Sequence, residues 1–196
     1  IDTWRNSSRI DAPPVKASNR VIKVRKIVIA SHIRHPLKTG INIVSDNKTD
    51  NVFNGAEALV RMLEAHGVRH IFGLCGDTTL PFYDALYRLD HKIEHILTRD
   101  ERSAAYMADG YARVTKKVGV CEGPSGGGAT YILPGLVEAG ESSVPILAIT
   151  SDVSVGSRGH YPLTELDQEG LMRPLTKWNA VIPRADMLPD MVRTAF

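Results

Sequence analysis

The sequence predicts an α/β fold: one doubly wound parallel sheet with helices on both faces, preceded by an irregular basic N-terminal segment. From residue 54 onward, short segments rich in β-branched residues alternate with amphipathic segments of helical length. This alternation is typical of repeated βαβ units. The composition, 43% hydrophobic and 23% charged over 196 residues, is that of a globular domain with one core.

Composition also excludes several classes of protein. No uninterrupted apolar run approaches the roughly 18 residues that a membrane-spanning helix needs. The two cysteines, Cys75 and Cys121, are too few for a disulfide framework and favour a reducing compartment. They form no CxxC pair, and the seven histidines show no spacing such as H-E-x-x-H. We therefore predict no metal site in this chain.

Residues 1–50 differ in charge from the rest of the chain. They carry ten Lys and Arg against four Asp, a net charge of +6, whereas the other 146 residues have a net charge of −4. A basic arm for nucleic acid or for a membrane surface is one interpretation. We favour a flexible, solvated extension or a targeting remnant, with no nucleic-acid or membrane partner. The expected location is the cytoplasm, or an organelle if residues 1–50 include a transit peptide.

A helix, a strand and a second helix open the regular part of the sequence. Asn54 and Glu57 have the spacing of a capping box, which predicts the start of the first helix. Residues 68–74 follow as a short buried strand. The second helix is expected over about 79–89, with Pro81 in its first turn, where a missing N–H costs nothing. The side chains expected on its buried side are Leu80, Tyr83, Leu86 and Tyr87.

The same alternation continues toward the C-terminus and defines one sheet domain, which we assign to residues 51–185. The remaining predicted elements are a strand over 92–97, a helix over 100–114, a strand over 118–121, a glycine-rich loop over 123–130, a helix over 131–141, a strand over 145–151, a strand over 176–182 and a terminal helix from about Asp186.

Ligands of open α/β sheets bind beyond the carboxyl ends of the strands. The segments expected there are 75–78, 98–101 and 123–130. The last of these, GPSGGGAT, lacks three successive side chains and lets the backbone approach a flat or bulky ligand. It has neither the Walker A order nor the G-x-G-x-x-G order. A ligand-binding loop and a plain strand-to-helix turn therefore both stay open.

Glu101 is the second candidate for a functional residue. It lies in the first turn of a predicted helix, where an acid is most often only a partner for the helix dipole. The inner stripe of that helix consists of small residues: Ala104, Ala105, Ala108 and Ala112. Such a stripe lets another helix or a subunit approach closely. No G-x-S-x-G elbow is present, so nothing indicates a serine hydrolase.

Five segments follow one another in a familiar order. They are NGAEALVRMLEAHGVRHIFGLCGDTTLPFYDAL (54–86), RDERSAAYMADGYAR (99–113), GVCEGPSGGGAT (119–130), PILAITSDV (145–153) and RPLTKWN (173–179). Together they resemble the N-terminal pyrimidine-binding domain of thiamine-diphosphate-dependent enzymes, in particular the group of acetolactate synthase, pyruvate oxidase and benzoylformate decarboxylase. The resemblance covers about residues 52–196.

The resemblance implies a catalytic role for Glu101, which occupies the position of the family's motif glutamate. That carboxylate hydrogen-bonds N1′ of the cofactor's aminopyrimidine and favours the imino tautomer, which activates the cofactor for attack on a 2-oxo acid. The resemblance also implies that Cys75, Gly76 and Thr130 contact the cofactor. The loop on the substrate side would comprise Ser125, Gly126, Gly127 and Gly128.

The resemblance further implies what lies outside this chain. Mg²⁺ and the diphosphate would be held by a separate domain, whose G-D-G and Asn-Asn motifs do not occur in these 196 residues. A requirement for FAD is undecided. The family's cofactor lies between two subunits, so we expect a homodimer or tetramer acting on a 2-oxo acid, and no turnover by the isolated chain. Residues 186–196 would begin the connection to a middle domain.

Several positions depart from the synthase pattern. Asp100 replaces the His of the usual His-Glu pair, and the S-G-P-G-A-T-N loop reads SGGGATY. The synthase's Phe-Gln pair aligns with Leu163 and Thr164, although Glu165 is kept. A related decarboxylase, lyase or hydrolase therefore fits as well as a synthase. A non-catalytic α/β domain that binds partners and a nucleotide-binding domain are the alternatives from other classes.

Overall fold

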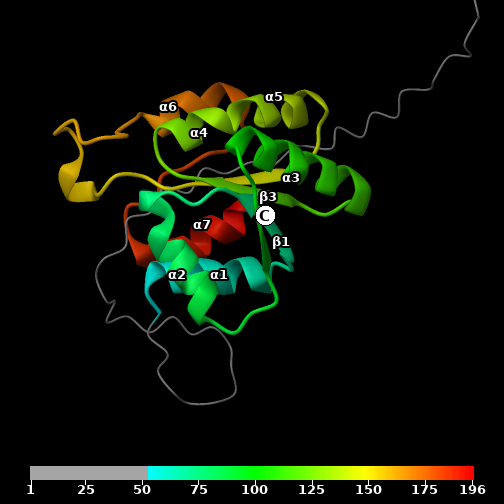
Figure 1. The fold of residues 1–196 in the computed structure, drawn as a ribbon, viewed down its shortest axis with the longest axis horizontal. Helices are drawn as coiled ribbons and strands as arrows, with labels where there is room; N and C mark the ends of the chain where they lie inside the picture. The colour runs from blue at the N-terminus through cyan, green and yellow to red at the C-terminus, as the bar shows by residue number, and fades with distance from the viewer. Residues whose placement is uncertain (1–52) are drawn as a thin grey trace, which may run out of the picture.

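The computed structural model describes residues 53–196 (Figure 1). The predictions for residues 1–50 lie outside these residues. The helices and strands, in chain order, are α1 (Gly55–Ala65), β1 (His70–Gly73), α2 (Leu80–Arg88), β2 (Glu94–Leu97), α3 (Glu101–Thr115), β3 (Gly119–Gly123), α4 (Gly127–Tyr131), α5 (Leu133–Glu141), β4 (Ile146–Thr150), α6 (Gln168–Met172) and α7 (Leu188–Ala195). None of these helices is both long enough and apolar enough to cross a bilayer.

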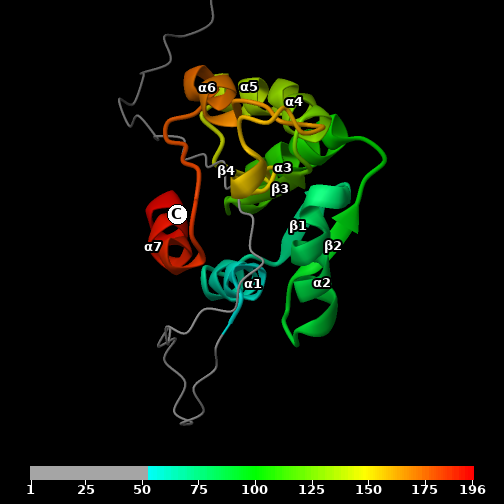
Figure 2. The same ribbon diagram turned by 90° about the vertical axis from the view of Figure 1, so that its left-hand side faces the viewer.

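The four strands form one parallel sheet in the order β2-β1-β3-β4. The chain moves outward from β1 to β2 through α2 and then returns past β1 to β3 through α3. Because such crossovers are right-handed, this reversal puts the two helices on opposite faces of the sheet. Figures 1 and 2 show α1, α2 and α7 on one face and α3 to α6 on the other. The predicted doubly wound α/β fold is confirmed.

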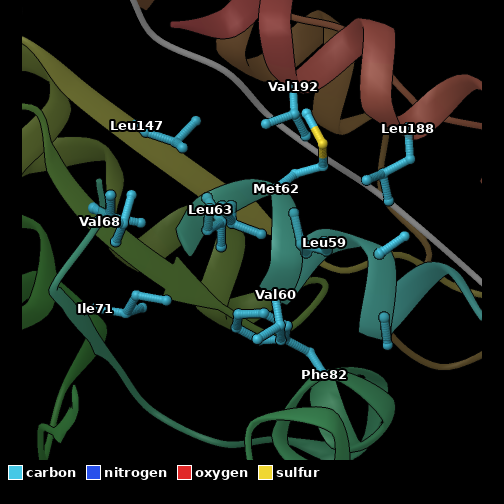
Figure 3. Close-up of a cluster of buried hydrophobic side chains, with 14 of the residues drawn as sticks. Leu59, Val60, Met62, Leu63, Val68, Ile71, Phe82, Leu147, Leu188 and Val192 are labelled. Carbon is cyan, nitrogen blue, oxygen red and sulfur yellow. The ribbon is translucent and has the colours of Figure 1, made fainter. Parts of the chain in front are cut away.

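Large aliphatic side chains fill the face covered by α1, α2 and α7 (Figure 3). The helix α1 begins at the predicted capping box, in which Asn54 Oδ1 accepts from the Glu57 N–H at 2.9 Å and Glu57 Oε2 accepts from the Asn54 N–H at 3.0 Å. The side chains that α1 buries against the sheet and against α7 are Leu59, Val60, Met62 and Leu63. The terminal helix α7 therefore shares the core of the sheet.

The opposite face is packed with small residues. The predicted stripe of α3 is confirmed as buried, and it faces β3 and α5. A Cβ atom placed on Gly119 in β3 would overlap the carbonyl oxygen of Ala108, and one on Gly135 in α5 would lie 2.5 Å from the Cβ of Ala105. The helix α3 therefore lies closer to the sheet and to α5 than larger residues would allow.

The predicted buried side of α2 was partly wrong. Leu80 and Tyr87 are 55% and 90% exposed, whereas Phe82 and Ala85 are buried. Tyr83 and Leu86, the other two predicted residues, are partly buried and pack against the same core. The buried stripe of α2 is therefore rotated from the one that Leu80 and Tyr87 suggest. The helix packs on α1 through this stripe, and Leu80 and Tyr87 face outward.

Two further predictions need correction. Residues 176–182 form no strand; they are the connection by which the chain passes from α6 on one face to α7 on the other (Figure 2). The helix expected over 131–141 begins earlier, at Gly127, and is divided into α4 and α5. Pro134 explains the division, because it has no N–H to donate to the carbonyl of Thr130.

The close approach of α3 can be tested by adding single methyl groups. We expect Gly119→Ala to lower the free energy of unfolding by about 1–3 kcal/mol or more, because its Cβ would meet rigid backbone. Gly110→Ala is the matched control, since a Cβ there meets nothing within 4 Å and alanine favours a helix by up to about 1 kcal/mol. Urea denaturation of both variants measures the difference; equal effects would contradict the packing.

Candidate functional site

The carboxyl ends of all four strands are tied together by threonine hydroxyls. Thr78 Oγ1, in the loop after β1, lies 2.5 Å from Ser151 Oγ and accepts from the Ser125 N–H at 3.0 Å. Thr98, directly after β2, donates its hydroxyl to the carbonyl of Gly73 at 3.1 Å. The three segments that the sequence placed at this edge therefore do meet there.

Glu101 is the first residue of α3 and is only 8% exposed. A Cβ atom on Gly128 would lie 3.2 Å from its Oε1, and one on Gly123 would lie 3.5 Å from its Cγ. The carboxyl group therefore lies against bare backbone. Among residues 53–196, no group donates a hydrogen bond to it. This arrangement leaves a buried acceptor available to a donor on a flat molecule that enters from outside.

The glycine-rich loop is partly covered. Ser125 is 3% exposed, and its hydroxyl lies 2.6 Å from Thr164 Oγ1. Gly126 has a φ of +66°, and a Cβ there would lie 2.8 Å from the Cβ of Thr164. Gly127, in contrast, faces open space, and Thr130 donates its hydroxyl to the Gly127 carbonyl at 2.7 Å. Of the residues predicted on the substrate side, Gly127 is therefore the most accessible.

Cys75 and Gly76 lie at the same edge as the glycine-rich loop. The thiol of Cys75 is free, and the residue is exposed. A Cβ on Gly76 would lie 2.6 Å from Pro124, and a Cβ on Gly128 would overlap the same ring. Pro124 is therefore held between two glycines, which brings the β1 loop against the β3 loop.

A cluster of three polar side chains, missed by the sequence analysis, lies on the opposite face of the sheet from Glu101, close enough for the charge of Glu101 to act on it. Glu122 on β3 is completely buried, and its Oε1 accepts a short hydrogen bond from the Tyr83 hydroxyl. His95 Nε2 lies 2.9 Å from the Tyr83 oxygen and 3.4 Å from Glu122 Oε1. Glu122 Oε2 has no hydrogen-bond partner within the described part of the chain. We call Glu122, Tyr83 and His95 the acid cluster.

Burial sets the protonation of the acid cluster. It raises the pKa of the Glu122 carboxyl, the hydrogen bonds from His95 and Tyr83 oppose that rise, and the negative charge of Glu101 adds to it. Burial also raises the pKa of the Tyr83 hydroxyl, as does the charge of Glu122. The tyrosine therefore stays protonated, and burial favours the protonated form of Glu122.

A small cavity adjoins the acid cluster on the face covered by α1 and α2. The residues that line it are Ala56, Leu59, Thr78, Thr79, Pro81, Phe82, Glu122, Ile149, Thr150 and Ser151. Thr150 Oγ1 is buried and, like Glu122 Oε2, has no partner among residues 53–196. These residues hold no group of three or more His, Cys, Asp or Glu side chains that could bind a metal ion.

A signal for Glu122 is present in the sequence. It is the one acid in the otherwise apolar and glycine run GVCEG, which forms β3 and is buried at every position. It pairs in register with Gly73 of β1, where a Cβ would overlap its carboxyl group. An acid in a buried strand, with a glycine in the neighbouring strand, is the pattern that identifies it.

Comparison with known proteins identifies relatives of this chain. The family model described as "Thiamine pyrophosphate enzyme, N-terminal TPP binding domain" matches residues 53–171. A probable acetolactate synthase large subunit of Methanocaldococcus jannaschii is 45% identical over 142 residues, 72% of this chain and 24% of the relative. Acetolactate synthase isozyme 2 large subunit of Escherichia coli is 43% identical over 143 residues, 73% of this chain and 26% of the relative. The chain thus spans about a quarter of the length of these curated relatives.

The role of Thr78 in joining the strand ends can be tested directly. We expect Thr78→Val to lower the free energy of unfolding by about 1–3 kcal/mol, because the Ser125 N–H loses its acceptor. The control is Thr194→Val in α7, where an exposed hydroxyl bonds only to the carbonyl of Asp190 and its loss should cost less than about 0.5 kcal/mol. Equal losses in urea denaturation would show that the strand ends do not depend on Thr78.

The raised pKa of Glu122 has a defined effect on stability. Because the folded protein holds this proton more tightly than the unfolded chain does, the stabilisation is complete below the ordinary pKa of 4.5 and is lost as the pH rises through the folded pKa. As the pH rises through this range, we expect the free energy of unfolding of the wild type to fall relative to that of Glu122→Gln. The fall should be at most about 1.4 kcal/mol per pH unit. Urea denaturation from about pH 4 to pH 8 measures this difference; a constant difference would contradict the raised pKa.

Proposed function

The chain belongs to the thiamine pyrophosphate enzymes and contains their N-terminal TPP-binding domain, and from this premise we propose that it holds the aminopyrimidine ring of thiamine diphosphate in an enzyme of the acetolactate synthase kind. Glu101 is the residue that we place against the ring. The supporting observation is its buried carboxyl group, which lies against the bare backbone of Gly123 and Gly128.

The residues at this edge fit an aminopyrimidine. The ring is flat, and the glycine-lined surface beside Glu101 offers a flat molecule close approach. A ring nitrogen is a partner for a carboxyl group that has no hydrogen bond within residues 53–196. Glu101 begins α3, so its side chain is fixed by a helix rather than by a loop.

Thiamine diphosphate supplies an acidic carbon and an electron sink for cleaving or joining bonds next to a carbonyl group. In our proposal, Glu101 hydrogen-bonds N1′ of the aminopyrimidine and shares a proton with it. The buried position excludes water from this hydrogen bond, which strengthens the interaction. The N-terminus of α3 lies at the same place and favours negative charge on Glu101.

The other predicted residues would surround the ring. We propose that Cys75 and Gly76 pack beside it from the β1 loop. Thr130 acts from within α4, where its hydroxyl bond to Gly127 fixes the position of the open glycine. Ser125 closes the loop through Thr164, so its contribution would be to shape the substrate side together with the three glycines.

We propose that the substrate is a 2-oxo acid. The acetolactate synthases to which the chain is similar provide this part of the proposal. The departures at Asp100, Gly127, Tyr131 and Thr164 leave a decarboxylase, lyase or hydrolase of the same family as alternatives to a synthase. Mg²⁺ and the diphosphate would be held by another domain, and FAD stays undecided.

We propose further that the domain works in a homodimer or tetramer. Large hydrophobic side chains of Tyr106, Met107, Tyr131 and Val137 are exposed on α3, α4 and α5. Gly128 of α4 lies against Glu101, and Gly135 of α5 packs on α3 at Ala105, one turn of the helix further on. A second subunit that covers this surface would bury the hydrophobic side chains and close the site at the same time.

The test is Glu101→Gln in the full-length protein that contains this domain. We expect its rate of 2-oxo acid consumption to fall by roughly 10²-fold to 10⁴-fold, the range for loss of an acid–base group. Glutamine keeps the size of the side chain, so the melting temperature should stay close to that of the wild type. Thermal unfolding of the two proteins checks that the fold is intact.

The matched control is Glu94→Gln, an exposed carboxyl on the edge strand β2, which should leave the rate unchanged. An unchanged rate in Glu101→Gln would instead favour a non-catalytic domain that binds partners. The isolated 196-residue chain should show no turnover; robust turnover without a second domain would contradict the proposal.

A further inference from the structure

We propose that the acid cluster is a proton relay in which His95 and Tyr83 carry protons between solvent at the edge of the sheet and Glu122 beside the cavity. Glu122 is the buried proton carrier of this relay. The relay itself follows from the geometry of the described residues. Its use, to give or take protons in the reaction beside Glu101, rests on the proposed function.

The outer end of the relay reaches solvent. His95 lies on β2, the edge strand, and its side chain is 15% exposed. The Tyr83 and His95 rings are in contact, with centroids 4.7 Å apart and an interplanar angle of 62°. This contact holds the imidazole against the hydroxyl, and the 2.9 Å separation of His95 Nε2 and the Tyr83 oxygen is that of a hydrogen bond.

The inner end is shielded from water. Glu122 is completely buried, and its carboxyl group occupies the space that a side chain on Gly73 would fill. An apolar residue in place of Glu122 would avoid the free-energy cost of burying a charge. The strand pair instead combines a buried acid with a glycine and gives the acid two hydrogen-bond partners, Tyr83 and His95.

Proton transfer through these three groups balances without any other reactant. When His95 is an imidazolium and Glu122 a carboxylate, His95 Nε2–H donates to the Tyr83 oxygen and the Tyr83 O–H donates to Glu122 Oε1. The hydroxyl proton moves to Oε1 while the Nε2 proton replaces it on the tyrosine oxygen. The products are a neutral imidazole with its proton on Nδ1, an unchanged tyrosine and a carboxylic acid.

Tyr83 has to give its hydroxyl proton to Glu122 and receive the proton of His95 at the same time. Its pKa is raised by burial and by the charge of Glu122, so a free tyrosinate is not populated. The charged and titratable groups that face the relay are Glu101 at the start of α3 and Cys75 after β1. The negative charge of Glu101 disfavours a second charge on Glu122, so the acid form of Glu122 is favoured while Glu101 is ionised.

Glu122 can deliver its proton on the cavity side once the protonated carboxyl group turns about its Cγ–Cδ bond and carries the O–H from the Oε1 position to the Oε2 position. Its Oε2 has no hydrogen-bond partner among residues 53–196, and Thr150 Oγ1, from the same cavity lining, has none either. Thr78 and Ser151 also line the cavity, and Thr78 binds the backbone of the glycine-rich loop at Ser125. The cavity therefore lies directly under the loop that the proposed function places beside the substrate.

The relay can be tested in the 196-residue chain without any cofactor. The infrared carbonyl band of the protonated Glu122 carboxyl is identified by its loss in Glu122→Gln. A rapid pH jump then measures how fast this band grows or disappears. We expect Tyr83→Phe, which keeps the ring and removes the hydroxyl, to slow the change at least tenfold. Tyr87→Phe, on the exposed side of the same helix, should match the wild type.

His95→Gln provides a second variant that also cuts the path, so the test survives if Tyr83→Phe does not fold. Equal rates in the wild type and in either folded variant would overturn the relay, as would the absence of any band that Glu122→Gln removes. In the full-length protein, Tyr83→Phe should change the pH profile and the solvent isotope effect of turnover. If Glu101→Gln has no effect on turnover, the proposed function fails, while the pH-jump result still decides the relay.

Discussion

The close approach of α3 to the sheet is the constraint from which the site follows. The helix runs antiparallel to β3, so that Ala108 lies beside Gly119 and Glu101 lies beside Gly123 at the other end of the strand. Only small residues permit this distance, because the contacts that would be violated involve backbone atoms. A wider spacing would move Glu101 away from the bare backbone of β3 and of the glycine-rich loop.

The alternation of side chains along β3 then separates two carboxyl groups. Successive residues of a strand point to opposite faces, so Cys121 and Gly123 face α3, whereas Glu122 faces α1 and α2. Glu101 approaches the first face, next to Gly123, and the acid cluster occupies the second. The two acids remain close enough for the charge of one to affect the pKa of the other. The carboxyl groups of Glu101 and Glu122 thus lie on opposite faces of β3, near the carboxyl end of that strand.

Local patterns in the sequence predicted the fold well. The capping box at Asn54 depends only on residues three positions apart, and the order of strands and helices depends on hydrophobic period, which is also local. The stripe of α2 could not be read in the same way, because Phe82 and Ala85 are buried by the position of α1 and not by their own pattern. The segment 176–182 has strand-forming residues, but it pairs with none of the four strands and instead connects α6 to α7.

The site was predictable only in part, for a related reason. Glu101 and the glycine-rich loop carry short patterns that are visible in the sequence, whereas Glu122 gains its meaning from residues on three other elements. His95 is 27 positions away and Tyr83 is 39 positions away. No spacing rule connects them, since the parallel crossovers of the sheet bring them together.

The position of Gly73 supports a functional origin for this buried acid. A carboxyl group without partners would shift the strands or admit water, and a glycine within a strand weakens it. Here the glycine makes room for the acid, and the hydroxyl of Tyr83 and the ring of His95 satisfy one of its two oxygens. Asp109 and Glu165 also keep one buried carboxyl oxygen without a partner within residues 53–196, but only Glu122 combines such an oxygen with the Tyr83–His95 pair and with a place in the cavity lining.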